Sequence, residues 1–268
     1  MAVQRRGYIF GAFLLSVLCV LLVVVGISSD SWVVCTTVAD SSALDGNFRY
    51  GLFRGEILVY GLATPNIHTM YMTCIVELNA CAVSCKTEED ARQMEVRALA
   101  QGFQPRADCI SSTDVDESHQ SDNPPVISFA FYVSLLVILF LQLTFGVLSA
   151  ALAIINATKN PTEPVFGLPG CLWANVVTAI LGVVSLFMFG INWTASGLSD
   201  HLAVSYIAFG YFTPIASLGF SYWLLIPATL CPIANVGLIQ SRSYLLEKDP
   251  PPPTIKLENH SDGTIFLY

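Results

Sequence analysis

The sequence predicts an all-α membrane protein, a four-helix transmembrane bundle with a small extracellular antiparallel β-sheet and a helix in its first loop. The main observation is the apolar stretch 126–155, which holds no Asp, Glu, Lys, Arg or His. About 20 apolar residues already span a bilayer core. The whole stretch, at a rise of about 1.5 Å per residue, would tilt or project beyond it. Three similar runs and a composition of 54% hydrophobic and 12% charged residues argue against a buried helix of a soluble protein.

The negative charge of the chain is local. Residues 29–125 hold 14 Asp and Glu against 6 Lys and Arg, which equals the net charge of −8 of the whole chain. The remaining residues therefore balance, and no basic cluster large enough for nucleic acid is present. The acidic segment is expected to lie outside the membrane as one large loop.

The first apolar run, 8–28, is interpreted as an uncleaved signal anchor and first span. The short segment 1–7 before it carries Arg5 and Arg6, which place the N-terminus in the cytoplasm by the positive-inside rule. A cleaved signal peptide is the alternative. The run is longer than a signal-peptide core, however, and no A-x-A site follows it.

The large loop 29–125 is expected to fold as a small domain. Its early part has the β-branched and alternating patterns of strands, and a polar, acidic linker (111–125) precedes the second span. The expected strands cover 33–38, 48–53, 57–60 and 71–78.

A helix is expected over 88–101 of this loop. Thr87 can cap its N-terminus, and the acidic residues that follow suit the positive end of a helix dipole. Ala91, Met94 and Ala98 would share its packed face.

The rest of the chain alternates short polar segments with spans. After the second span (126–155) we expect a cytoplasmic connector, a third span, a second extracellular loop, a fourth span and a cytoplasmic tail, at 156–167, 168–191, 192–215, 216–239 and 240–268. Pro227 and Pro232 fall in the fourth span, where neighbouring helices can satisfy freed carbonyl groups. Four spans bring both termini to the cytoplasmic side. We expect a multi-pass protein of the plasma membrane.

The spans lack the ionisable groups that pumps, carriers and ion pores commonly use. Their polar residues Gln142, Asn175 and Asn235 are more simply read as interhelical hydrogen-bonding groups than as substrate contacts. No Ser/His/Asp pattern, phosphate-binding loop or metal-ligand spacing occurs. We therefore expect no enzyme activity, no cofactor and no metal.

The loop motifs resemble a known family. Trp32 followed by Tyr50-Gly51-Leu52-Phe53 resembles the W…GLW pattern of claudin-like tetraspans, and the string YGLFRGE at 50–56 is more similar to the clarins. Segments 161–170 and 198–200 also resemble clarin loops. The resemblance covers the whole chain, although the first loop is longer than is usual for clarins and lacks the two cysteines that soon follow GLW in claudins.

The resemblance implies a claudin-like fold and a non-enzymatic membrane organiser or adaptor. Clarins are associated with sensory cells of hearing and vision, where they support membrane, synapse and cytoskeleton assemblies. Two other classes stay open: a claudin-type cell-cell adhesion protein, and an auxiliary subunit of an ion channel related to stargazin. Either would use the extracellular loop to meet its partner, whereas the spans meet the lipid bilayer.

Five of the eight cysteines fall in the first loop, which allows two bridges and leaves one cysteine odd. Cys74 and Cys85 enclose ten residues, a spacing that claudin sheets also show, and are the candidate pair. A zinc site is disfavoured because no His stands near them. The other cysteines, in the spans, are read as small packing residues.

Two further sites are predicted at the surface. Asn192-Trp-Thr194 is an extracellular glycosylation sequon at the end of the third span. At the C-terminus, Phe266 and Tyr268 have the spacing of a PDZ-domain ligand, which adds as a strand to the domain. The prolines at 250–253 would hold this ligand away from the membrane, or would themselves bind an SH3 or WW domain.

Overall fold

A computed structural model of the chain describes residues 2–38, 46–60, 65–105, 109, 115–116, 124, 126–158, 165–195 and 213–248. This part of the chain contains four helices long and apolar enough to cross a membrane. They are α1 (Ala2–Ser28), α3 (Phe129–Thr158), α4 (Leu168–Ala195) and α6 (Phe220–Lys248). The prediction of four apolar spanning helices is confirmed.

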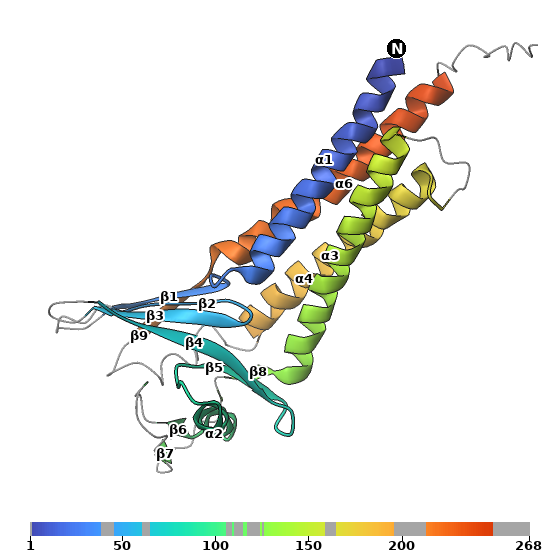
Figure 1. The fold of residues 1–268 in the computed structure, drawn as a ribbon. Coiled ribbons are helices and arrows are strands. Elements are labelled where there is room, and N and C mark those ends of the chain that lie inside the picture. The colour runs from blue at the N-terminus through green and yellow to red at the C-terminus, as the bar shows by residue number, and fades with distance from the viewer. Residues whose placement is uncertain are drawn as a thin grey trace, which may run out of the picture.

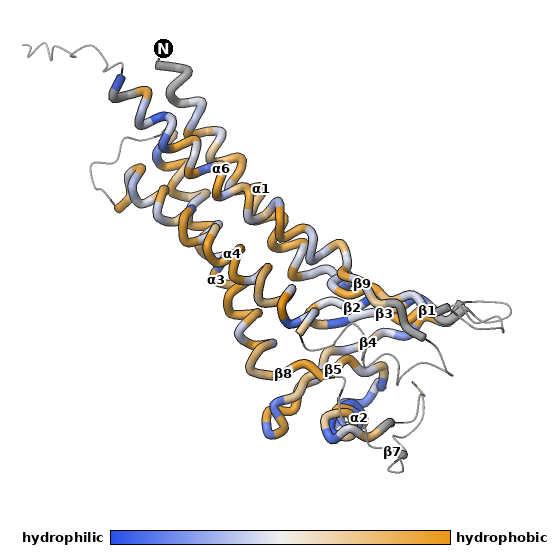
Figure 2. Tube along the Cα trace, turned by 180° about the vertical axis from the view of Figure 1, so that it is seen from behind, coloured by the Kyte–Doolittle hydropathy of each residue, from blue (hydrophilic) through white to orange (hydrophobic). Residues whose placement is uncertain are grey.

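The four helices form a closed ring in the order α1, α3, α4, α6, each packing on its two neighbours. Figure 1 shows that the first residues of α1 and the last of α6 lie together, at the end of the bundle opposite the sheet. Apolar residues run along all four helices, and hydrophilic residues gather in α2 (Glu89–Ala100) and in the last turns of α6 (Figure 2). This pattern fits a bundle whose sides face lipid.

A seven-stranded antiparallel sheet sits at the other end of the bundle (Figure 1). Its spatial order is β8-β5-β4-β3-β2-β1-β9. The strands are β1 (Val33–Val38), β2 (Gly46–Tyr50), β3 (Arg54–Tyr60), β4 (Pro65–Ile75), β5 (Ala80–Ser84), β8 (Ile127–Ser128) and β9 (Thr213–Leu218). The predicted antiparallel sheet is therefore present, and five of its strands come from the first loop in simple hairpin succession.

Two segments expected to begin spans are strands instead. Residues 216–218 belong to β9, which pairs with β1 from Val33↔Leu218 to Val38↔Thr213. Residues 127–128 form β8, which pairs with β5. Apolar composition alone does not separate a short buried strand from the start of a helix, and the long-range partner decides the outcome here.

Asn79 joins the β4–β5 turn to the start of α3. It has φ 48°, a left-handed conformation that Asn tolerates better than most residues. Its side-chain oxygen accepts hydrogen bonds from the Ala130 N–H at 3.0 Å and the Ser128 hydroxyl at 3.2 Å. The Asn79 side chain thereby caps the start of α3, in the manner of an N-cap residue.

Helix α2 (Glu89–Ala100) confirms the expected helix in the first loop, but its details differ. The N-cap position is Glu88, without a side-chain cap, rather than Thr87. Its buried face holds Glu95, Val96, Ala98 and Leu99, whereas Met94 is 53% exposed. Of the predicted face, Ala98 is buried and Met94 is not, because the buried face is turned toward Glu95, a carboxylate that was not expected to be buried.

Candidate functional site

The site that the sequence motif marks is the contact between the sheet and the bundle. We call this contact, formed by Trp32, Tyr50, Leu52, Phe189 and Tyr222, the seam. The Trp32 side chain is 1% exposed and packs edge-on against Phe189 of α4, with ring centroids 4.9 Å apart. Tyr222 of α6 lies 6.5 Å from Trp32 and 5.6 Å from Phe189, again between ring centroids. Such aromatic clusters stabilise a fold by more than the burial of their apolar surface alone would give.

Hydrogen bonds fix Trp32 on three sides. Its indole nitrogen donates to the Gly26 carbonyl of α1 at 2.7 Å, and its backbone N–H donates to the Tyr50 carbonyl at 3.0 Å. The Gly219 N–H, between β9 and α6, donates to the Trp32 carbonyl at 2.8 Å. One residue therefore connects the first helix, the second strand and the start of the last helix.

Gly51 and Leu52 complete the seam from the β2–β3 turn. A Cβ atom added to Gly51 would overlap the carbonyl oxygen of Ser29, so only glycine permits this approach of two backbone segments. The Leu52 carbonyl accepts a 2.8 Å hydrogen bond from the Tyr132 hydroxyl of α3. Phe53, although part of the predicted motif, is 45% exposed and lies outside the packed cluster.

Sequence reasoning missed Phe189, Tyr222 and Tyr132 as members of this site. Each lies close to the sheet end of an apolar helix, where aromatic residues are common at membrane interfaces. That position was the available signal, but nothing in the sequence relates these residues to Trp32.

The part of the first loop beyond the seam is cross-linked by disulfides that differ from the predicted one. The structure pairs Cys74 with Cys81 and Cys85 with Cys109, not Cys74 with Cys85. Cys74 and Cys81 are directly opposite in the β4–β5 register, with Cα atoms 4.1 Å apart. Cys85 follows the end of β5 and faces Cys109, at a Cα separation of 5.2 Å. Cys35 is the odd cysteine, and burial raises the pKa of its thiol to about 11.

We expect non-reducing peptide mapping to recover both of these bridges. Replacing Cys85 and Cys109 together with Ser should release α2 from the sheet, because a loop of 24 residues loses a cross-link worth about 3 kcal/mol. Limited proteolysis should then cleave within 89–100. The matched double variant removes the Cys74–Cys81 bridge, which closes a sequence separation of only 7 residues, and should change cleavage less. A peptide that links Cys74 to Cys85 would contradict the structure.

A charged cluster lies beneath α2. Glu95 and Lys86 are 1% and 2% exposed, and the Ser84 hydroxyl donates to the Glu95 carboxylate. Burial raises the pKa of Glu95, while the Ser84 hydrogen bond and the Lys86 charge act in the opposite direction. Isolated buried charges are costly, so this cluster needs all its members.

The raised pKa of Glu95 predicts a pH dependence. The folded protein binds this proton more tightly than the unfolded chain does. The contribution of the Glu95 carboxyl to stability is therefore fully present at pH values below the ordinary carboxyl pKa. This contribution is lost as the pH rises through the raised pKa of Glu95 in the folded protein. Hydrogen exchange at 95–99, corrected for the intrinsic rate, should show α2 opening more readily over that rise. Glu95→Gln should flatten the dependence, and an unchanged slope in the variant would contradict this assignment.

A chain of hydrogen bonds crosses the interior of the bundle and uses one residue from each spanning helix. The Asn235 amide donates to the Ser16 hydroxyl at 2.9 Å and to the Asn175 side-chain oxygen at 3.0 Å. The hydroxyls of Ser16 and Ser149 lie 3.1 Å apart. Gln142 is also buried but lies apart from this chain of bonds, beside Gly182 of α4. The interpretation of Asn175 and Asn235 as interhelical hydrogen-bonding residues agrees with these contacts.

Asn235→Leu should lower the stability of the bundle. Interhelical hydrogen bonds in membranes are worth about 0.6 to 2 kcal/mol each, and this change removes two. We expect a lower thermal midpoint in detergent, with no loss for Gln240→Leu, an exposed position on the same helix. Equal midpoints for both variants would show that the network does not hold the helices together.

The remaining predicted sites are placed as follows. Asn192 lies in the last turn of α4, next to the buried Trp193, and its glycosylation stays a prediction. Phe266 and Tyr268 lie outside the described residues, as does segment 198–200. Among the described residues, no group of three or more His, Cys, Asp or Glu side chains is arranged to hold a metal ion.

No family model matches the chain, and neither does any curated protein with which it was compared. The resemblance to clarins and claudins therefore rests on the sequence alone, on the motifs at Trp32, 50–56, 161–170 and 198–200 and on the order of spans and loops.

Proposed function

We propose that this chain is a clarin-like tetraspan membrane organiser, without enzyme activity, in the plasma membrane of sensory cells. In this proposal both termini are cytoplasmic, and the sheet and α2 are extracellular. The extracellular domain presents a fixed surface to a partner, and the cytoplasmic tail recruits a PDZ scaffold through Phe266 and Tyr268.

The observation that carries this proposal is the construction of the seam. The indole of Trp32, its hydrogen bonds to Gly26 and Tyr50, and the β1–β9 pairing join both loops to the bundle. The Cys85–Cys109 disulfide then closes the segment that carries α2 beside the same sheet, and the Cys74–Cys81 disulfide joins β4 to β5. A domain that is cross-linked internally and held to its helices in this way keeps a constant orientation above the membrane, which suits the ordering of other membrane proteins.

Epitope tags test the topology. A tag inserted within 111–117 should stain on unpermeabilised cells, and a tag after Tyr268 should stain only after permeabilisation. The reverse pattern would overturn the orientation on which the function depends.

Proximity labelling in native sensory tissue tests the function. An organiser should label scaffold and cytoskeletal proteins on the cytoplasmic side, and adding one Gly after Tyr268 should remove PDZ proteins from that set, because it moves the terminal carboxylate. A single channel that co-purifies with the chain would favour an auxiliary subunit instead. Aggregation of non-adherent cells on expression would favour cell-cell adhesion.

A further inference from the structure

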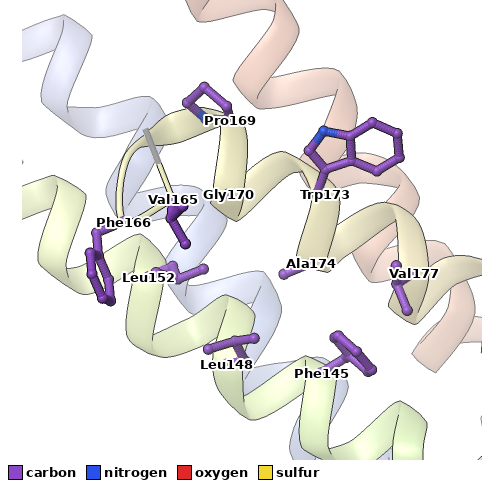
Figure 3. Close-up of a pocket in the computed structure, with 10 residues that line it drawn as sticks. All are labelled: Phe145, Leu148, Leu152, Val165, Phe166, Pro169, Gly170, Trp173, Ala174 and Val177. Carbon is purple, nitrogen blue, oxygen red and sulfur yellow. The ribbon is translucent and has the colours of Figure 1, made fainter. Parts of the chain in front are cut away.

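A groove on the outer face of α3 and α4 is not used by the proposed function. It has a volume of about 450 Å³ and is lined by apolar side chains only. Figure 3 shows the lining: one wall from α3, one from α4, and an end formed by the turn that precedes α4. Its volume lies in the range of ligand-binding pockets, about 300 to 1,000 Å³.

The closed end of the groove is built by specific contacts. The Asn156 amide of α3 donates to the Phe166 carbonyl at 2.8 Å, which holds the turn against the last helical turn of α3. A Cβ atom added to Gly170 would overlap the Val165 carbonyl, so glycine at this position lets the turn fold back over the groove. The end of the groove is thus formed before any ligand binds. It corresponds to part of the 161–170 segment singled out in the sequence.

The groove also has a definite floor and walls. Leu152 and Ala174 are 6% and 5% exposed and form its floor, whereas Phe166 and Trp173 are 50% and 66% exposed and rise at its sides. The indole N–H of Trp173 makes no hydrogen bond to the described part of the chain. In Figure 3 the indole nitrogen is on the edge of the ring nearer Pro169, toward the turn.

The length of the groove along α4 limits what can occupy it. From Pro169 to Val177 it follows α4 for eight residues, or about 12 Å at 1.5 Å per residue. One leaflet of a core about 30 Å thick has a similar depth. A partner helix would need a groove along the full length of the span, whereas a single lipid chain needs a groove of only this length. Because the lining is apolar throughout, the occupant must be apolar along its length.

We propose that this groove binds one acyl chain of a glycerophospholipid from the leaflet on the connector side. Phospholipid chains surround the groove at high concentration. Trp173 lies four residues, or about 6 Å along the helix, from the Pro169 end of the groove. Its indole N–H is on the ring edge nearer that end (Figure 3), so it can donate to an ester carbonyl at the membrane interface. The inference rests on the membrane placement proposed above.

Photo-crosslinking tests the site directly. The full chain is reconstituted in phosphatidylcholine vesicles that contain a phosphatidylcholine with a diazirine on one acyl chain, and cross-linked peptides are mapped. We expect adducts concentrated in 145–152 and 165–177, several-fold above equally apolar stretches of α1 and α6. Equal amounts of adduct on all four helices would show that the probe labels the surrounding lipid contacts without preference for the groove, and would overturn the proposal.

Two matched variants and a competitor sharpen the test. Trp173→Ala should reduce the groove adducts several-fold, whereas Trp223→Ala, which removes a similarly exposed tryptophan from α6, should leave them unchanged. Ala174→Phe fills the floor and should also reduce them, and the Trp173 variant decides the outcome if this one fails to fold. A photoreactive sterol that labels the same residues and displaces the phospholipid would overturn the choice of occupant. A chain outside the membrane would give no adducts on any helix, so failure of the placement is distinguishable.

Discussion

Trp32→Ala is expected to detach the sheet from the bundle. The substitution removes a fully buried indole, a change that typically costs about 3–5 kcal/mol in a packed core. It also takes away the ring against which Phe189 and Tyr222 pack. We expect a large drop in thermal midpoint in detergent and poor delivery to the cell surface.

Two further variants separate packing from hydrogen bonding at this position. Trp32→Phe keeps an aromatic ring but loses the donor to the Gly26 carbonyl, and should cost about 1 kcal/mol. Trp223→Ala removes a tryptophan that is 53% exposed and should cost much less than Trp32→Ala, although it loses the contact with Tyr222 and the hydrogen bond to the Leu218 carbonyl. If Trp32→Ala and Trp223→Ala had equal midpoints, the seam would not be the contact that seats the sheet.

Gly51→Val is expected to trap the protein in the endoplasmic reticulum. The new Cβ would overlap the Ser29 carbonyl, and neither backbone segment can move freely. The Ser29 N–H is bonded to Val25 in the last turn of α1, and the Gly51 N–H closes the turn to Arg54. Overpacking costs about 1–3 kcal/mol where side chains can adjust, and more here because main-chain atoms must shift.

The control for this variant is Gly237→Val on α6, where an added Cβ meets no atom within 4 Å. Gly51→Val should lose most of the surface staining of the wild type, whereas Gly237→Val should stain near the wild-type level. Normal surface delivery of Gly51→Val would show that the close approach at Ser29 is not required.

The helices were the predictable part of this fold because their signal is local. A span is set by the length of an apolar run, and each of the four runs carries that information by itself. Four strands of the first loop were also predicted in outline, since β-branched residues and alternation are read along a single segment. β5 was missed, and the strand expected over 71–78 runs past the end of β4 at Ile75 into the turn before β5. The Trp32 and Tyr50–Leu52 motif could likewise be found from its residues.

What escaped prediction depends on distant partners. β9 is a strand because β1 lies beside it, far away in the chain. Cys74 pairs with Cys81 because the hairpin register sets them opposite each other, and that register is not encoded in the spacing of cysteines. Glu95 can be buried because the Ser84 hydroxyl donates a hydrogen bond to its carboxylate and the Lys86 charge lies near it. The ring of Phe189 finds Trp32 only once the helices have assembled.

The junctions between strands and helices give the molecule a mechanical property. Ser128 of β8 runs directly into Phe129 of α3, one residue separates β9 from α6, and four residues separate α1 from β1. A torque applied to the sheet therefore reaches three of the four helices through covalent links with almost no slack. Only α4 is joined to the sheet by a longer segment, 196–212. Twisting the outer sheet should thus tilt α1, α3 and α6 together, with α4 following through its packing against α3 and α6.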